Sequence, residues 1–215
     1  MDRYLETFET WNKVAKLYED KFMDLDLYNE TYDKFCKLLP KNNPSILEIG
    51  CGPGNITKYL LNKRPDFEIL GIDISQNMID LAKINCPNTK FEVMDSREID
   101  NIKTKFDAVV CGFCLPYLSE FDIKKIIGDC KNLLNEKGIL YLSFVEGDKD
   151  KSGYQKGSSG DRTYFYYHNT ENLTNQLKAN DFDNLNFMLI NYQKNDKTKE
   201  THTIIIAEKL AKDKD

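Results

Sequence analysis

The sequence lacks the long apolar runs of a membrane protein. No run of about 18 apolar residues occurs, and the start, MDRYLETFETWNKVAK, alternates charged with aromatic residues where a signal peptide would be apolar. The sequence also has fewer basic than acidic residues, with 30 Lys and Arg against 35 Asp and Glu, so its net charge is −5. A surface of this sign repels phosphate backbones. We therefore expect no nucleic-acid partner and no membrane association.

Histidine, with 2 residues, is too scarce to suggest a metal centre, and no cluster of His, Cys and Asp has metal-ligand spacing. The 6 cysteines are scattered through a chain long enough to fold without disulfides, so we expect reduced thiols and a cytoplasmic location. Cys111 and Cys114 have the spacing of a redox dithiol, but Leu115, Pro116 and Tyr117 follow them instead of a helix. A dithiol oxidoreductase stays open as one alternative.

What the sequence does contain is an alternation of strand and helix patterns within a length that suits a single domain, 1–215. Over residues 1–40 apolar side chains recur at three- and four-residue steps, which predicts a helical cap or lid. Over residues 45–145 short apolar runs alternate with helical periodicity. This alternation predicts a parallel sheet with crossover helices, which we expect to be the cofactor-binding core.

The pattern changes after Val145. Residues 146–168 contain the polar, glycine-rich stretch 147–162, which predicts a mobile loop beside the substrate. Residues 169–209 predict a final helix and hairpin. The elements expected there are a helix from Thr170, strands at 185–193 and 201–208, and a polar turn at 194–197.

The segment from Leu47 to Gly54 predicts a ligand-binding turn between a strand and a helix. Gly50 and Gly52 let the backbone bend sharply and approach a ligand with no Cβ in the way. A dinucleotide fingerprint needs glycine at the sixth position counted from Gly50, where this chain has Asn55. Glu48, two residues before the first glycine, would also repel a pyrophosphate. The turn therefore disfavours nicotinamide and flavin dinucleotides.

Two acidic residues end the next two strands, at the edge of a parallel sheet where ligands bind. Asp73 follows Gly52 by a little over 20 residues, where a carboxylate can accept hydrogen bonds from both hydroxyls of a ribose. Asp95 ends the third strand and can accept a hydrogen bond from an adenine amino group. Both residues interrupt apolar runs, which a purely structural role explains poorly.

In this order the elements resemble the class I S-adenosylmethionine-dependent methyltransferase family of the small-molecule type, and the resemblance covers nearly the whole chain. It implies an α/β, Rossmann-like, doubly wound fold whose mostly parallel, seven-stranded sheet has an antiparallel last strand and an N-terminal helical cap. It also implies S-adenosyl-L-methionine as the cofactor and S-adenosyl-L-homocysteine as the product.

The resemblance assigns a set of cofactor-binding residues. The glycine turn is expected against the methionine part, Asp73 on the ribose, Met78 against the adenine ring, and Asp95 with the Ser96 amide on the adenine amino group. Gly54 alone would also suit a plain tight turn, and Met78 a core position. The full expected set is Trp11, Tyr18, Glu48, Gly50, Cys51, Gly52, Gly54, Asp73, Ile74, Met78, Asp95, Ser96 and Cys111.

The acceptor side is less defined. The residues from Phe113 to Tyr117 are expected to wall the substrate pocket, and the asparagine of the N-P-P-Y motif is absent there, which disfavours methylation of a base or a glutamine. Glu146, His168 and Tyr117 are the candidate catalytic residues, whereas His202 is interpreted as a half-exposed strand residue. The predicted function is methyl transfer by in-line displacement to an unidentified small molecule, in a monomer or homodimer. A non-catalytic S-adenosylmethionine-binding protein is the second alternative.

Overall fold

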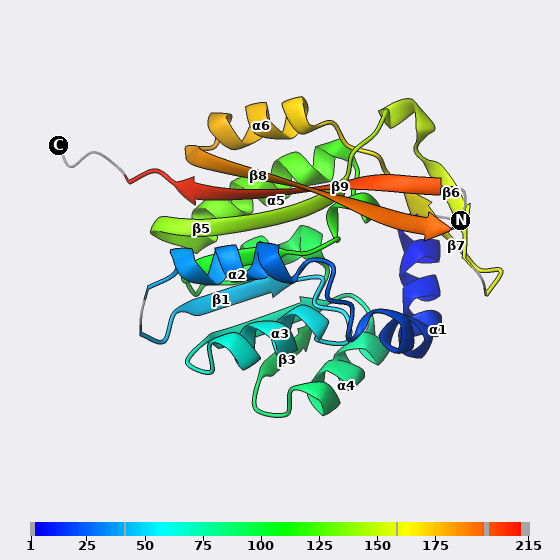
Figure 1. Cartoon of the computed structure of the whole chain (residues 1–215), viewed down its shortest axis with the longest axis horizontal. Coiled ribbons are helices and arrows are strands. Elements are labelled where there is room, and N and C mark those ends of the chain that lie inside the picture. Colours follow the sequence, from blue (N-terminus) through cyan, green and yellow to red (C-terminus); the bar gives the residue numbers. More distant parts are fainter. Residues whose placement is uncertain (1–2, 41, 158, 196–197, 212–215) are drawn as a thin grey trace.

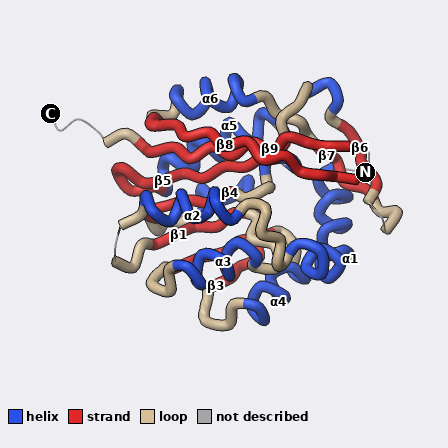
Figure 2. Tube along the Cα trace, in the orientation of Figure 1, coloured by secondary structure: helices blue, strands red, loops and turns tan. Residues whose placement is uncertain are grey.

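The computed structural model describes residues 3–40, 42–157, 159–195 and 198–211. At its centre lies a seven-stranded sheet in the order β3-β2-β1-β4-β5-β9-β8, with helices on both faces (Figures 1 and 2). Its strands are β1 (Ser45–Ile49), β2 (Glu68–Asp73), β3 (Lys90–Val93), β4 (Phe106–Cys111), β5 (Leu134–Val145), β8 (Phe182–Asn195) and β9 (Thr198–Lys209). The helices are α1 (Arg3–Phe22), α2 (Asn29–Leu38), α3 (Asn55–Lys63), α4 (Gln76–Asn85), α5 (Glu120–Leu133) and α6 (Thr170–Ala179).

Strand pairing confirms the expected fold class. The strands from β1 to β5 pair in parallel, while β9 runs antiparallel to both β5 and β8. From β1 the chain continues to β2 and β3 on one side of the sheet, and from β4 it crosses to β5 on the other side, where β9 later pairs between β5 and the edge strand β8. The carboxyl ends of β1 and β4 therefore form the topological switch point, where open α/β sheets bind ligands.

The core lies on both faces of the sheet because the central strands carry apolar side chains on both faces. Leu47, Val109 and Leu140 pack on the face covered by α5 and α6. Ile46 and Tyr141 pack on the opposite face, with α2 and α3. Burial on both faces explains why these strands are continuous apolar runs in the sequence.

The expected cap over residues 1–40 divides into two helices with different roles. Only α1 lies across the carboxyl edge of the sheet (Figure 1), whereas α2 packs on the sheet face, with its Tyr32 and Phe35 rings against Tyr141. Side-chain hydrogen bonds connect α1 to α4 and to the segment around Tyr164. Asn12 Oδ1 accepts from the Asn77 amide of α4 at 3.0 Å. Thr7 Oγ1 accepts from the Tyr164 amide at 3.0 Å.

The prediction of a loop over 147–162 is wrong. That segment forms a short 3-10 turn, Lys149–Lys151, and then β6 (Gly153–Lys156), which pairs antiparallel with β7 (Arg162–Phe165). The cross-strand rings of Tyr154 and Tyr164, 5.2 Å apart, stabilise this hairpin, and Arg162 forms an ion pair with Glu6 of α1. Gly157 and Gly160 lie at its turn, of which residue 158 is not described.

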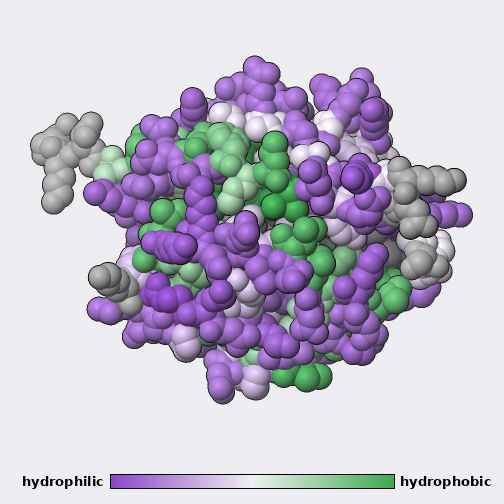
Figure 3. All heavy atoms as spheres, in the orientation of Figure 1, coloured by the Kyte–Doolittle hydropathy of each residue, from purple (hydrophilic) through white to green (hydrophobic). Residues whose placement is uncertain are grey.

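The C-terminal helix and hairpin are confirmed, with longer strands than the sequence predicts. Both strands of the final hairpin extend beyond the predicted ranges 185–193 and 201–208. Of the expected turn at 194–197, residues 196 and 197 lie outside the described residues. No helix in the described part of the chain is long and apolar enough to cross a membrane. The face seen in Figure 3 is mostly hydrophilic, with apolar atoms in separate small patches.

Candidate functional site

A cavity of about 440 Å³ lies at the carboxyl edge of the sheet, beneath α1. Its walls come from the segments that follow β1, β2, β3 and β4, together with α1 and the hairpin strand β9. The structure thus brings together residues that are far apart in the sequence. The expected site residues that line it are Trp11, Tyr18, Gly50, Gly52, Asp73, Ile74, Met78, Asp95, Ser96 and Tyr117.

The glycine turn forms the floor of this cavity. Gly50 and Gly52 have φ angles of 68° and 53°, in the left-handed region that favours glycine. The amides of Gly50 and Cys51 donate to Ile72 O at 2.8 and 2.9 Å, which ties the turn to β2. A Cβ on Gly52 would stand 3.7 Å from the Tyr18 ring, between the turn and α1. The missing side chain therefore keeps the cavity open.

Asp73 connects the turn to α4. Its Oδ2 accepts from the Gly52 amide at 3.0 Å, and its Oδ1 accepts from the Ser75 amide at 2.9 Å. Ser75 then caps α4, since its Oγ accepts from the Met78 amide at 3.1 Å. Burial raises the pKa of Asp73 above its usual value, and the amides of Ser75 and Gly52 oppose that shift. Each carboxylate oxygen still has a free lone pair, so Asp73 can accept from a vicinal diol.

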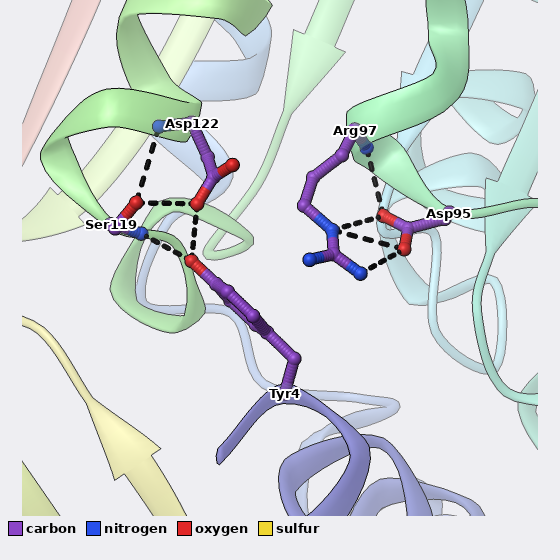
Figure 4. A network of polar contacts seen from close by, with 5 residues as sticks. All are labelled: Tyr4, Asp95, Arg97, Ser119 and Asp122. Carbon is purple, nitrogen blue, oxygen red and sulfur yellow. Dashed lines mark hydrogen bonds and ion pairs between the residues drawn. The ribbon is translucent and has the colours of Figure 1, made fainter. Parts of the chain in front are cut away.

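Asp95 lines the cavity, but it already holds a partner that the sequence analysis missed. Both of its carboxylate oxygens contact the Arg97 guanidinium, with Asp95 Oδ2 at 2.5 Å from Nη2, and Oδ1 also accepts from the Arg97 amide (Figure 4). Arg97 stacks over the Tyr4 ring of α1, 4.3 Å from its centroid. Tyr4 in turn contacts Asp122 and accepts from the Ser119 amide at 2.9 Å. Asp95 therefore joins the cavity wall to α1.

Four residues of the expected cofactor set do not line the cavity: Glu48, Cys51, Gly54 and Cys111. The side chains of Glu48 and Cys111 are buried on the faces of their strands, because side chains on a strand point to one face or the other. The cavity is reached instead by the turn that follows β1. Gly54 serves close packing, since a Cβ there would stand 3.4 Å from Ala82 of α4. These four residues therefore lie behind the residues that line the cavity and hold them in place.

Glu48 is a buried carboxyl without a compensating charge. It is 1% exposed, and its Oε2 accepts from Thr57 Oγ1 at 2.5 Å. Its Oε1 has no hydrogen-bond partner among the described residues. Burial raises the pKa of the Glu48 carboxyl to about 8. Near neutral pH this group is therefore mostly protonated.

The cysteine pair does not resemble a redox site. Cys111 is buried, and its hydrogen bond with Cys114 together with its burial raises the pKa of the Cys111 thiol well above the usual range. A catalytic dithiol requires the opposite shift. All six cysteines lie in the described part of the chain and are free. Within that part, no group of three or more His, Cys, Asp or Glu side chains is arranged to hold a metal ion.

Of the three candidate catalytic residues, only Tyr117 lines the cavity. Its ring packs edge-on against Trp11 of α1, with centroids 5.1 Å apart, and burial raises the pKa of its hydroxyl. Glu146 instead contacts Thr170, accepting from its amide at 3.2 Å, and so anchors the start of α6. His168 Nε2 lies 2.9 Å from Leu115 O, and burial lowers the pKa of its imidazole. Glu146 and His168 line a second cavity, so the structure argues against either as a base for the first.

His202 is the functional candidate that the sequence analysis missed. It is 6% exposed rather than half-exposed, and it lines the cavity together with Glu200 of the same strand. A spacing of two residues places both side chains on one face of β9. This two-residue spacing is the signal in the sequence that could have grouped Glu200 with His202. The sequence does not show which face of β9 is buried, because that depends on the neighbouring strands β5 and β8.

Residues 46–138 match a family model described as a methyltransferase domain. This match agrees with the resemblance to class I S-adenosylmethionine-dependent methyltransferases that the sequence predicts. Protein 235L of Invertebrate iridescent virus 6, which is named as a methyltransferase, is 35% identical over 114 residues, 53% of this chain and 41% of the relative. The chain spans 41% to 60% of the length of the curated relatives considered, among which are carboxy-S-adenosyl-L-methionine synthases of Campylobacter jejuni.

Solved structures show the same fold at low identity. A methyltransferase of Methanosarcina mazei has a TM-score of 0.69 at 21% identity and covers 83% of this chain and 98% of its own. The magnesium protoporphyrin IX methyltransferase of Synechocystis, solved with bound S-adenosylmethionine, has a TM-score of 0.71 at 17% identity and covers 97% and 98%. These similarities extend the fold assignment beyond residues 46–138 to nearly the whole chain.

Proposed function

We propose that this protein transfers the methyl group of S-adenosyl-L-methionine to a small-molecule acceptor by in-line displacement. The observation that carries the proposal is the single cavity that joins the glycine turn, Asp73 and the Asp95 segment beneath an aromatic helix. The match of residues 46–138 to a methyltransferase domain supports it.

The residues of the cavity fit this cofactor. Asp73 offers carboxylate lone pairs to ribose hydroxyls, and Gly50 and Gly52 leave room along the turn for the methionine part. Ile74 and Met78 supply apolar surface for an adenine ring. When bound, the cofactor supplies a methyl group that is already electrophilic because it is attached to a positively charged sulfur.

The protein's own contribution is orientation and exclusion of water. Aligning the two reacting atoms can provide several kcal/mol of the barrier reduction. Trp11, Tyr18 and Tyr117 form an aromatic wall, in which Trp11 packs edge-on against both tyrosines. Such a wall displaces water and suits a cationic ligand, because aromatic faces attract positive charge.

The test has two stages. Isothermal titration with S-adenosyl-L-methionine and S-adenosyl-L-homocysteine should show saturable binding of both, and absence of binding would refute the proposal. A screen of a metabolite library with methyl-labelled cofactor should then transfer label to at least one small molecule. Binding without transfer to any library member would favour the non-catalytic alternative. The raised pKa of Cys111 disfavours the dithiol oxidoreductase.

The setting of the enzyme is also part of the proposal. Free cysteines in the described residues and a net charge of −5 suit a reducing, cytoplasmic location and a small-molecule substrate in preference to nucleic acid. We propose a monomer or homodimer, which sedimentation analysis would decide.

A further inference from the structure

The cavity continues well beyond the residues assigned to the cofactor. Asp73 ends β2 and His202 lies on β9, and β1, β4 and β5 separate these strands in the sheet. At about 4.8 Å between neighbouring strands, the two positions are roughly 19 Å apart. The part of the cavity around β9 is therefore free for an acceptor, and we call it the acceptor end: Tyr28, Phe113, Tyr192, Glu200 and His202.

His202 is held rigidly at the acceptor end. Its Nδ1 forms a 2.8 Å hydrogen bond with Tyr28 Oη, and its ring stacks on Tyr192 with centroids 4.9 Å apart. The Phe113 ring packs edge-on against the His202 ring, with centroids 5.1 Å apart. The remaining ring nitrogen, Nε2, is buried and has no hydrogen-bond partner among the described residues. A buried polar atom of this kind calls for an explanation, and a ligand is one.

A carboxylate lies beside the second ring nitrogen of His202. A protonated ring would donate from Nδ1 to Tyr28 Oη and present its Nε2 proton to Glu200, whose Oε2 lies 3.8 Å away. Interaction with His202, followed by that with Lys194, holds the pKa of Glu200 below its usual range, so this carboxylate is charged. A charged group beside Nε2 stabilises the positive ring once a proton has arrived.

Charge balance indicates which acceptor fits. Glu200 Oε1 forms an ion pair with Lys194 at 2.6 Å and its Oε2 lies beside His202 Nε2, so side chains of the protein engage both carboxylate oxygens. This arrangement favours a neutral acceptor that loses a proton over a protonated amine. The remaining walls, Tyr28, Tyr192 and Phe113, are flat and aromatic, which favours a planar molecule.

We propose that His202 Nε2 is the proton acceptor of the reaction and that the acceptor end binds a planar molecule with an acidic hydroxyl, a phenol or an enol. The inference rests on the proposed methyl transfer. The hydroxyl proton moves to Nε2 while an oxygen lone pair forms the bond to the methyl carbon. The carbon–sulfur bond breaks and its electron pair stays on sulfur. The imidazolium then returns its proton to water once the product has left.

A binding experiment tests the proton transfer without turnover. The probe is 4-nitrophenol, whose ionised form absorbs visible light, added to protein saturated with S-adenosyl-L-homocysteine. We expect the wild type to increase the ionised fraction of the bound probe, and the variant His202→Gln to bind the probe without ionising it. The matched control is His168→Gln, since His168 is the only other histidine and lines the second cavity; it should behave as the wild type.

Nuclear magnetic resonance adds a direct readout. With 2 histidines in the sequence, the difference between wild type and His202→Gln assigns the ring signals of His202. Binding of the probe should shift both ring nitrogens of His202 to the imidazolium position and leave those of His168 unchanged. Ring signals of His202 that stay neutral with the probe ionised would overturn the assignment of the proton acceptor.

Methyl-transfer activity provides the third test. Methyl transfer to a series of phenols of graded acidity should fall about 100-fold or more in His202→Gln, the range of general-base effects. The loss should shrink as the phenols become more acidic, while affinity for S-adenosyl-L-homocysteine stays within about threefold. Primary amines methylated equally well by both proteins, with no transfer to phenols, would refute the inference and leave methyl transfer standing. Loss of cofactor binding in the wild type would instead refute the proposed function itself.

Discussion

Replacing Glu48 with Gln tests whether the carboxyl beneath the glycine turn holds a proton near neutral pH. Glu48 is 1% exposed, and burial raises the pKa of its carboxyl to about 8. In the unfolded chain a glutamate has a pKa of about 4.3. Between these two values the folded state binds more protons than the unfolded state. The contribution of Glu48 to stability is therefore fully present below the lower pKa and is lost as pH rises through the higher one.

The pKa difference sets the size of the effect. Each pH unit between the two values is worth about 1.4 kcal/mol, so Glu48 should lower the free energy of unfolding by roughly 2–3 kcal/mol between about pH 5 and about pH 7. A glutamine at this position is neutral in both states and can still accept from Thr57 Oγ1 through its carbonyl oxygen. The variant Glu48→Gln should therefore lose this part of the pH dependence.

Urea unfolding at about pH 5 and about pH 7 measures the effect. We expect the stability of Glu48→Gln relative to wild type to rise by roughly 2–3 kcal/mol between the two pH values. The matched control is Glu68→Gln, because Glu68 is an exposed glutamate at the start of β2, and it should follow the wild type. A relative stability of Glu48→Gln that stays constant with pH would show that Glu48 is ionised in the folded protein, which would refute the reasoning from burial.

Three further measurements test other parts of the site. Asp73→Ala should weaken S-adenosyl-L-methionine binding at least tenfold by titration calorimetry, because each charge-assisted hydrogen bond is worth about 1.5–3 kcal/mol; unchanged affinity would place the ribose elsewhere. Cys111→Ser should leave methyl transfer within a few-fold, since its thiol pKa is raised, and a thiolate titrating near pH 6 would contradict this. Asn12→Ala should speed amide exchange in α1, because the Asn12 side chain accepts from the Asn77 amide of α4, and should enlarge the change in Trp11 emission on adding S-adenosyl-L-homocysteine. Exchange and emission equal to wild type would show that α1 is a fixed wall.

The parallel half of the fold could be predicted from the sequence because its signals are local. The run Ile46-Leu47-Glu48-Ile49 is a strand buried on both faces, and the glycines that follow it report the bend of the backbone directly. Asp73 stands out for the same reason, as a charged residue at the end of an apolar run. Each of these assignments depends on only a few neighbouring residues.

The β6–β7 hairpin could not be predicted in this way. Its residues are polar and glycine-rich, which is the pattern of a loop. What stabilises it is long-range: Lys13 of α1 forms an ion pair with Asp161 at 2.8 Å, and Thr10 Oγ1 donates to Arg162 O at 2.9 Å. The partners are about 150 residues apart in the sequence. No local pattern contains such contacts.

Two of the candidate catalytic residues lie away from the first cavity for a related reason. Glu146 and His168 lie near the carboxyl end of β5, where ligands are expected, but Thr170 and Leu115 engage their polar atoms. The sequence around His202 shows only that it lies in a strand, and not whether its side chain is buried. Its burial depends on Tyr28, Tyr192 and Phe113, which come from three other segments of the chain.

The two ends of the cavity therefore depend on the sequence in different ways. The cofactor end is built from turns that follow consecutive strands between Glu48 and Ser96, and each turn positions its own ligand group. The acceptor end exists only when the turn before α2, the segment after β4 and the hairpin β8–β9 meet around His202. Because α1 carries Trp11 and Tyr18 over the cofactor end, an acceptor that packs against these rings contacts the same helix. Binding at the two ends is then linked through the position of α1, so the cofactor should strengthen acceptor binding and the acceptor should strengthen cofactor binding by the same factor.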